Sequence, residues 1–284
     1  MNRSIFSELF NKAFRSGNPL FLLIGINILV FIAINLFALG EYLVGGQSSG
    51  ADWLTSQVSV PAYYADLPLK FWTIITYMFV QRDLFHLLFN MLWMYWMGLI
   101  FMDFLNKRQF IFVYFSGGIA GALLYLLAYN TIPVFVTSAQ SSILLGSSAS
   151  VMAIVAATAT LVPDFTIRLM LFGTVRLKYL AIAYFVLDII GIGGGNAGGS
   201  IAHIGGALIG FIFIKQLQSG NDLSKILTKR SKLKVVKSAD SKPVKNYLAD
   251  DQATIDSILD KISKSGYDSL SKIEKEQLFK ASKK

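Results

Sequence analysis

The sequence predicts an all-α fold, a polytopic membrane helical bundle of six transmembrane helices followed by a small helical tail. The 284 residues are 54% hydrophobic and only 15% charged, with a mean hydropathy of +0.54. Soluble domains usually carry about 25% charged residues. Six apolar segments are each close to the roughly 20 residues that a helix needs to cross the hydrocarbon core. Positive charges also concentrate in alternate loops and near both termini, which agrees with an even number of spans.

The membrane domain is predicted to cover residues 19–217, after a cytoplasmic segment at 1–18. The first apolar segment is a span and no signal peptide, because its apolar run is long and no small-residue cleavage site follows it. The loop at 40–84 is rich in Trp and Tyr, which favour the membrane interface, so we expect a structured interfacial outer loop there. An ordinary extracytoplasmic loop is the alternative. The six predicted spans are 19–39, 85–102, 110–129, 142–162, 177–192 and 199–217.

Lysine and arginine predict the orientation, because positively charged loops stay in the cytoplasm. They occur before the first span, after the second, after the fourth and after the sixth, and they are scarce in the other loops. Both termini are therefore expected in the cytoplasm. The residues concerned, besides the basic tail, are Arg3, Lys12, Arg15, Lys107, Arg108, Arg168, Arg176 and Lys178.

The tail holds most of the excess positive charge. Residues 215–284 carry 16 Lys/Arg and 9 Asp/Glu, which is +7 of the chain's net +9. We interpret 218–250 as a flexible basic linker near anionic lipid and 251–284 as a small cytoplasmic helical hairpin. Nucleic-acid binding is disfavoured, since the tail has no arginine cluster.

Polar residues inside the apolar segments are the candidates for chemistry, because burying them in a membrane is costly. His86 and His203 are the only two histidines, and both lie in predicted spans. Asn90 follows His86 by one helical turn. A serine-rich run, 146–150, stands near the start of the fourth span. By the predicted topology, all these groups lie at a similar depth in the outer half of the membrane.

A serine and a histidine suffice for acyl transfer, in which the histidine accepts the hydroxyl proton and later protonates the leaving amine. His86, Asn90 and the backbone amide of Ser148 could supply the oxyanion hole. The residues alone do not choose among Ser147, Ser148 and Ser150, and a hydroxyl bonded to its own helix carbonyl is an alternative for each. The chain has no cysteine, which excludes a thiol nucleophile and disulfides.

Three motifs make the sequence resemble the rhomboid family of intramembrane serine proteases. They are His86-Leu87-Leu88-Phe89-Asn90, Gly146-Ser147-Ser148-Ala149 and Ala202-His203-Ile204-Gly205-Gly206. The resemblance covers roughly residues 15–217, and the composition and tail are similar to rhomboids of Bacteroidetes-type bacteria. It implies that Ser148 is the nucleophile, that His203 is the base, and that His86 and Asn90 complete the oxyanion hole. It also implies a bacterial inner membrane location.

Three positions depart from the family pattern. Ala149 replaces the glycine that often follows the catalytic serine, and Thr73 replaces the arginine of a Trp-Arg pair in the first loop. Met152 stands where many members have an aromatic residue against the catalytic histidine, and a thioether holds an imidazole less specifically. These changes bear on efficiency and loop anchoring more than on the chemistry.

Asp188 in the fifth predicted span is a tempting third member of a triad. Since the resemblance to rhomboids implies a Ser-His dyad without an acid, we favour a hydrogen-bonded packing role for Asp188. The function predicted is cleavage of single-span membrane proteins near the outer end of their transmembrane segment, with transmembrane substrates and the bilayer as partners and no metal or cofactor. A catalytically silent rhomboid-like binder is the alternative. A channel is disfavoured, because the inner halves of the spans are apolar.

Overall fold

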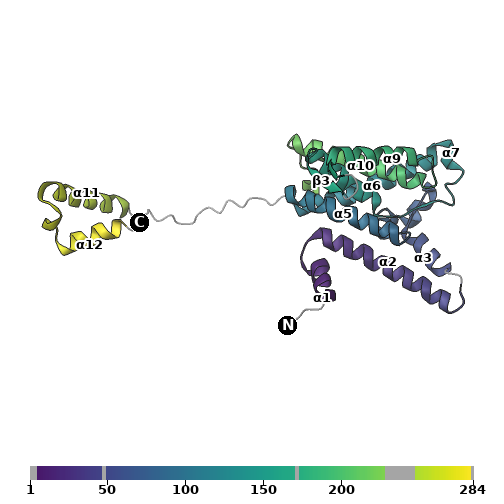
Figure 1. The fold of residues 1–284 in the computed structure, drawn as a ribbon, viewed down its shortest axis with the longest axis horizontal. Coiled ribbons are helices and arrows are strands. Elements are labelled where there is room, and N and C mark those ends of the chain that lie inside the picture. Colours follow the sequence, from purple (N-terminus) through teal and green to yellow (C-terminus); the bar gives the residue numbers. More distant parts are fainter. Residues whose placement is uncertain (1–4, 47–48, 170–172, 228–246, 283–284) are drawn as a thin grey trace. The chain divides into compact units, whose positions relative to one another are not determined.

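The computed structural model describes residues 5–46, 49–169, 173–227 and 247–282, which divide into two compact units (Figure 1). The first unit is Met1–Lys229 and the second is Arg230–Lys284. The predicted linker at 218–250 falls largely on 228–246, outside the described residues.

Three of the four long helices described in the first unit begin at capping side chains, which satisfy backbone N–H groups that have no partner within a helix; α10 has no such cap. Asn18 caps α2, Asp83 caps α5 by accepting from the backbone N–H of His86 at 2.8 Å, and Asn106 and Gln109 form a capping box at α6. The helical elements are α1 (Ile5–Phe10), η1 (Asn11–Arg15), α2 (Pro19–Leu43), α3 (Ser49–Val58), η2 (Tyr64–Lys70), α4 (Thr73–Thr76), η3 (Tyr77–Phe79), α5 (Leu84–Phe104), α6 (Lys107–Thr131), α7 (Pro133–Val136), α8 (Ser148–Leu161), α9 (Leu177–Gly191), α10 (Ala197–Gln218) and η4 (Leu223–Leu227).

Four of the described helices are long and apolar enough to cross a membrane, namely α2, α5, α6 and α10. The other two helices at predicted spans are shorter, because α8 has 14 residues and α9 has 15. The chain is thus an all-α membrane protein with four clear spans, where the sequence predicted six.

Helix α8 starts at Ser148, six residues later than predicted, because the preceding residues pair with the outer loop. Strand β2 (Ile143–Leu144) lies antiparallel to β1 (Val60–Pro61). Gly146 then has a φ of +118°, which ends the extended stretch before the helix begins. The loop at 40–84 contains β1 and several short helices.

A short hairpin between α8 and α9 was missed by the sequence analysis. Strands β3 (Thr166–Leu169) and β4 (Gly173–Arg176) pair antiparallel. Asp164 accepts hydrogen bonds from Lys178 (2.7 Å) and Arg176 (3.2 Å) beside it. The Lys178 ammonium, with help from Arg176, lowers the pKa of the exposed Asp164 carboxyl.

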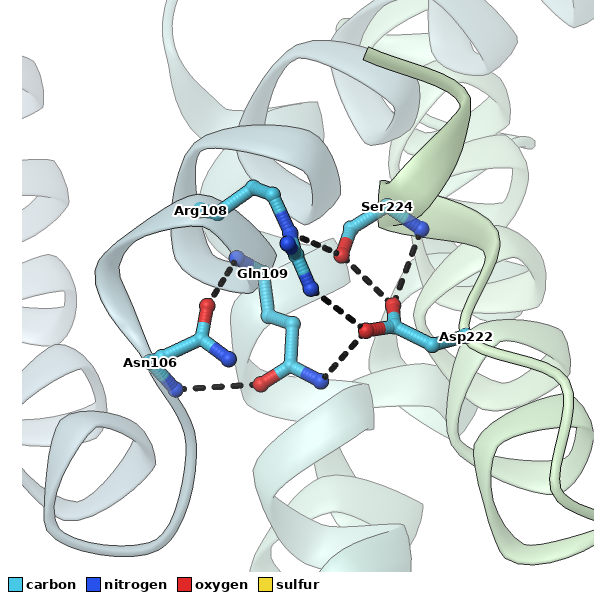
Figure 2. Close-up of polar contacts among 5 residues, drawn as sticks. All are labelled: Asn106, Arg108, Gln109, Asp222 and Ser224. Carbon is cyan, nitrogen blue, oxygen red and sulfur yellow. Dashed lines mark hydrogen bonds and ion pairs between the residues drawn. The ribbon is translucent and has the colours of Figure 1, made fainter. Parts of the chain in front are cut away.

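A polar cluster joins the start of α6 to the segment that follows α10 (Figure 2). We call it the Asp222 cluster, and it consists of Asn106, Arg108, Gln109, Asp222 and Ser224. Asp222 accepts from the Arg108 guanidinium at 2.7 Å and from the Gln109 amide at 3.3 Å, while Arg108 also donates to Ser224 at 3.0 Å. Burial alone would raise the pKa of Asp222, but the hydrogen bonds from Ser224 and Arg108 lower it below its ordinary value.

The second unit is a pair of helices, α11 (Tyr247–Ser265) and α12 (Lys272–Ala281), with the short η5 (Tyr267–Ser269) between them. Gly266 ends α11 at a φ of +78°, a conformation that favours glycine. Ser271 and Glu274 cap α12 reciprocally. The core of this unit is small and includes the buried side chains of Ile258 and Leu270.

Candidate active site

Ser148 is placed by the turn that opens α8. The backbone N–H of Gly146 donates to the Tyr77 carbonyl at 2.9 Å. A side chain at Gly146 would meet the His86 ring, because an ideal Cβ there would lie 2.8 Å from His86 Cε1. The Ser148 hydroxyl lies 3.5 Å from the same point. The glycine therefore lets the His86 ring and the Ser148 hydroxyl approach each other.

His86 and Ser148 line one cavity of about 680 Å³. The wall also includes Arg82 and Asp83 ahead of α5, Tyr125 from α6, and the residues from Gly195 to Gly199 at the start of α10. The N-terminal ends of α5, α8 and α10 thus border the same space. Such a cavity can admit water and an unwound peptide segment to the Ser148 hydroxyl.

The His86 ring is held by the backbone just before its own helix. The N–H of Arg82 donates to His86 Nδ1 at 3.2 Å. Because a backbone N–H can only donate, Nδ1 must carry the lone pair and Nε2 the proton in the neutral ring. His86 Nε2 is therefore a hydrogen-bond donor.

His203 is absent from the residues that line the cavity, but its helix packs closely on the helix that carries Ser148, with no side chains between α8 and α10 at the contact. A Cβ at Gly206 would overlap the carbonyl group of Ala149, and one at Gly121 of α6 would lie 2.6 Å from Ala149 Cβ. Gly206 follows His203 by three residues, and Ala149 follows Ser148 by one. The close contact therefore brings the two turns that carry Ser148 and His203 together.

The His203 ring contacts α9. Its Nδ1 lies 2.7 Å from Asp188 Oδ1, and the two side chains are 12% and 7% exposed. Tyr184 packs edge-on against the ring, with centroids 6.1 Å apart. Tyr184 therefore supplies the aromatic contact that Met152 does not. Asp188 was expected to have a hydrogen-bonded packing role, and its hydrogen-bond partner in the structure is the His203 imidazole.

No hydrogen bond joins the Ser148 hydroxyl to the His203 ring among the contacts of the described residues. Hydrogen bonds of this kind are often long or poorly aligned without substrate and shorten when a substrate binds. His86 and His203 lie near enough to interact electrostatically.

Asn90 is buried and is absent from the residues that line the cavity. Its amide donates to Gln81 Oε1 at 2.9 Å. The amide nitrogen of Gln81 donates to Asn27 Oδ1 at 2.7 Å and to Ser147 Oγ at 3.0 Å. Sequence reasoning missed this network, although Asn27, a polar residue inside the first apolar segment, was a signal.

Within the described part of the chain, no group of three or more His, Cys, Asp or Glu side chains could hold a metal ion. The polar groups that line the cavity include the Ser148 hydroxyl, the His86 imidazole, the Asp83 carboxylate and the Asn196 amide. These are suited to proton transfer and to hydrogen bonding with a developing oxyanion.

Comparison with known families identifies two regions of the chain. Residues 68–218 match the family model described as "Rhomboid domain", which covers 151 of the 284 residues and includes all three motifs. Residues 248–284 match a second model, "Family of unknown function (DUF6576)", which corresponds to the second unit. No curated protein matches the chain. The chain belongs to the rhomboid family.

Proposed function

We propose that this protein is an intramembrane serine endopeptidase that cleaves single-span membrane proteins near the outer end of their transmembrane segment. The observation that carries the proposal is the cavity shared by His86 and Ser148, which the start of α10 also borders. His203 lies one turn after Gly199 on α10, and its role as the base is part of the proposal. Membership of the rhomboid family, whose members are generally serine intramembrane proteases, supports it.

In the first step, the Ser148 hydroxyl attacks a substrate carbonyl and passes its proton to His203 Nε2. Negative charge then develops on the carbonyl oxygen. His86 Nε2–H can donate to it, and so can the backbone N–H of Ser148, since the first amides of a helix have no partner within the helix. Asn90 uses one of its two amide hydrogens for Gln81 and does not line the cavity, so its contribution to the oxyanion hole requires a rearrangement when substrate binds.

In the second step, His203 returns its proton to the leaving amine, and the acyl group remains on Ser148. Water from the cavity then attacks this ester, with His203 again as the base, and the free serine is restored. A helical substrate hides its carbonyls in hydrogen bonds, so helix-weakening residues and a small residue at the cut site are expected. The chain needs no metal or cofactor for these steps.

The orientation follows from charge. Lys and Arg are enriched before α2, in the first turn of α6, between α8 and α9, and after α10. These segments are therefore on the cytoplasmic side of a bacterial inner membrane, and so are both termini. The cavity opens toward the outer side of that membrane. In this topology α8 and α9 cross with α2, α5, α6 and α10 as six spans.

A serine-reactive fluorophosphonate and a generic single-span substrate in liposomes test the proposal together. We expect wild type to be labelled and to cleave, and Ser148→Ala to lose labelling and about 10⁴-fold or more in kcat. His203→Ala should lose cleavage to a similar extent. Ser150→Ala is the matched control, because the Ser150 hydroxyl is buried and has no hydrogen-bond partner within the part of the chain that the structure describes. Equal labelling of wild type and Ser148→Ala would contradict the proposal.

A catalytically silent binder of membrane proteins is the second candidate. The missing Ser148–His203 hydrogen bond is the observation that favours it. Capture of single-span proteins without labelling or cleavage, by wild type and Ser148→Ala alike, would support the binder against the protease.

A further inference from the structure

The two histidines of the site have different partners on the same ring atom. His86 Nδ1 accepts from the backbone N–H of Arg82 at 3.2 Å. His203 Nδ1 lies 2.7 Å from Asp188 Oδ1. A neutral imidazole has one donor nitrogen and one acceptor nitrogen, so the partner of Nδ1 decides what Nε2 can do.

On His86, the amide partner leaves no choice of tautomer. Nδ1 holds the lone pair, and the proton is on Nε2. On His203, an ionised carboxylate can only accept, so the proton is on Nδ1 and the lone pair is on Nε2. The two rings are therefore opposite tautomers, one with a donor Nε2 and the other with an acceptor Nε2.

We propose that Asp188 is a positioning residue, which fixes His203 in the tautomer whose Nε2 can accept the Ser148 proton. The inference deepens the proposed function and rests on it for the role of His203. Asp188 acts through the imidazole and does not touch the substrate. The site then works as Ser148–His203–Asp188, with the acid supplied by α9.

The surroundings of Asp188 suit this role. The residue is 6% exposed, and its Oδ1 is on His203, while Oδ2 is buried without a hydrogen-bond partner among the described residues. A carboxylate buried only for packing would usually have both oxygens satisfied. Tyr184, one turn earlier on α9, packs edge-on against the same ring, and Trp93 stacks on Tyr184 with centroids 5.8 Å apart. The acid and the two aromatic rings together restrict rotation of the His203 ring.

The Asp188→Asn variant separates positioning from packing, because the two side chains have nearly the same shape. An asparagine can present its NH₂ group to Nδ1, which moves the ring proton to Nε2 and removes the acceptor that Ser148 needs. We expect kcat to fall by about 10²–10⁴-fold with little change in KM. Asp103→Asn is the matched control, since Asp103 is exposed near the end of α5.

The decisive measurement is ¹⁵N NMR of the imidazole rings in the full-length protein, in detergent or nanodiscs. The chain has only two histidines, so His86→Ala assigns both rings. At about pH 8, where an ordinary imidazole is neutral, we expect the proton on Nε2 of His86 and on Nδ1 of His203. Asp188→Asn should shift the His203 proton to Nε2 and leave the His86 tautomer unchanged. In the Asp103→Asn protein, both rings should keep the wild-type tautomers.

The inference is overturned if wild-type His203 carries its proton on Nε2, as a protonated Asp188 would require, or if both of its nitrogens are protonated. It is also overturned if Asp188→Asn keeps the wild-type tautomer and kcat. These results are distinct from failure of the proposed function, because the tautomers are read without any substrate. A wild type that never cleaves would refute the protease and leave the tautomer assignment standing.

Discussion

Among single residues, Gln81 connects the most distant parts of the site. Its side chain bonds Asn27 of α2, Ser147 ahead of α8, and Asn90 of α5, and all four side chains are buried. A satisfied buried network fixes the positions of its members, and a partly satisfied one is costly. Gln81 therefore holds in place both the residue before the nucleophile and the predicted oxyanion-hole amide.

Replacement of Gln81 by methionine should keep the volume and remove all three hydrogen bonds. We expect each lost bond to destabilise the protein by about 0.5–2 kcal/mol, and kcat to fall because Ser147 and Asn90 can relax. Thermal unfolding in detergent and cleavage kinetics measure the two effects. Gln140→Met, at an exposed position, is the control, and equal unfolding temperatures for the two variants would contradict the role given to Gln81.

The residue types of the site could be predicted, because polar side chains are conspicuous in apolar segments. Their partners could not. Asp188 and His203 were both known to lie in spans at compatible depth, but contact between them depends on how α9 and α10 are rotated about their axes. Gln81 bonds residues 54 and 66 positions away in the chain, and no local pattern encodes such contacts.

At the scale of elements, the contact between α8 and α10 determines the geometry of the site. No side chain separates the two helices where Gly206 packs on Ala149. Gly210 packs equally closely on the Ala153 carbonyl, because a Cβ at Gly210 would overlap that carbonyl oxygen. In lipid, helices associate through such close packing, because apolar side chains gain little from leaving the lipid.

Alanine at position 206 should therefore be costly although the change is one methyl group. The added Cβ would overlap the backbone of Ala149, which cannot rotate away, so α8 must move from α10. We expect the free energy of unfolding to fall by about 1–3 kcal/mol. We also expect kcat to fall by more than this loss of stability alone would explain. Gly40→Ala in α2, where a Cβ meets nothing within 4 Å, should be neutral or stabilising. Full activity of Gly206→Ala would contradict this explanation.

Helix positions followed from the lengths of the apolar runs, and most boundaries agree within a few residues. The start of α8 did not, because residues 143–144 pair with residues 60–61 across the chain. Hydropathy is similar for an apolar strand and an apolar helical turn, so it could not detect the change. The β3–β4 hairpin was missed because its strands are only four residues long.

At the scale of the whole molecule, the chain consists of two units with different means of stabilisation. The membrane unit depends on close helix packing. The second unit has a small core, and polar contacts between α11 and α12 therefore matter more. Lys261 donates to both carboxylate oxygens of Glu274, at 2.9 and 3.0 Å.

The pKa of Glu274 is lowered to about 2, first by the hydrogen bond from Lys261 and then by that from the Ser271 backbone. A depressed carboxyl pKa stabilises the folded hairpin above the ordinary value of 4.5 and ceases to do so as the pH falls through the folded value. A ¹³C NMR titration of the Glu274 carboxyl in the full chain should give this low pKa. Lys261→Met should raise it toward 4.5, whereas Lys264→Met should not. An unshifted pKa in wild type would show that the ion pair does not form.

The Asp222 cluster has a mechanical consequence for how the two units share one chain. A single carboxylate fastens the polypeptide to the first turn of α6 just after it emerges from α10. A force that pulls on the tail would act on these hydrogen bonds of Asp222 before it acted on α10, the helix that carries His203. Through this anchor, α10 and the reacting groups can keep their positions when the tail moves.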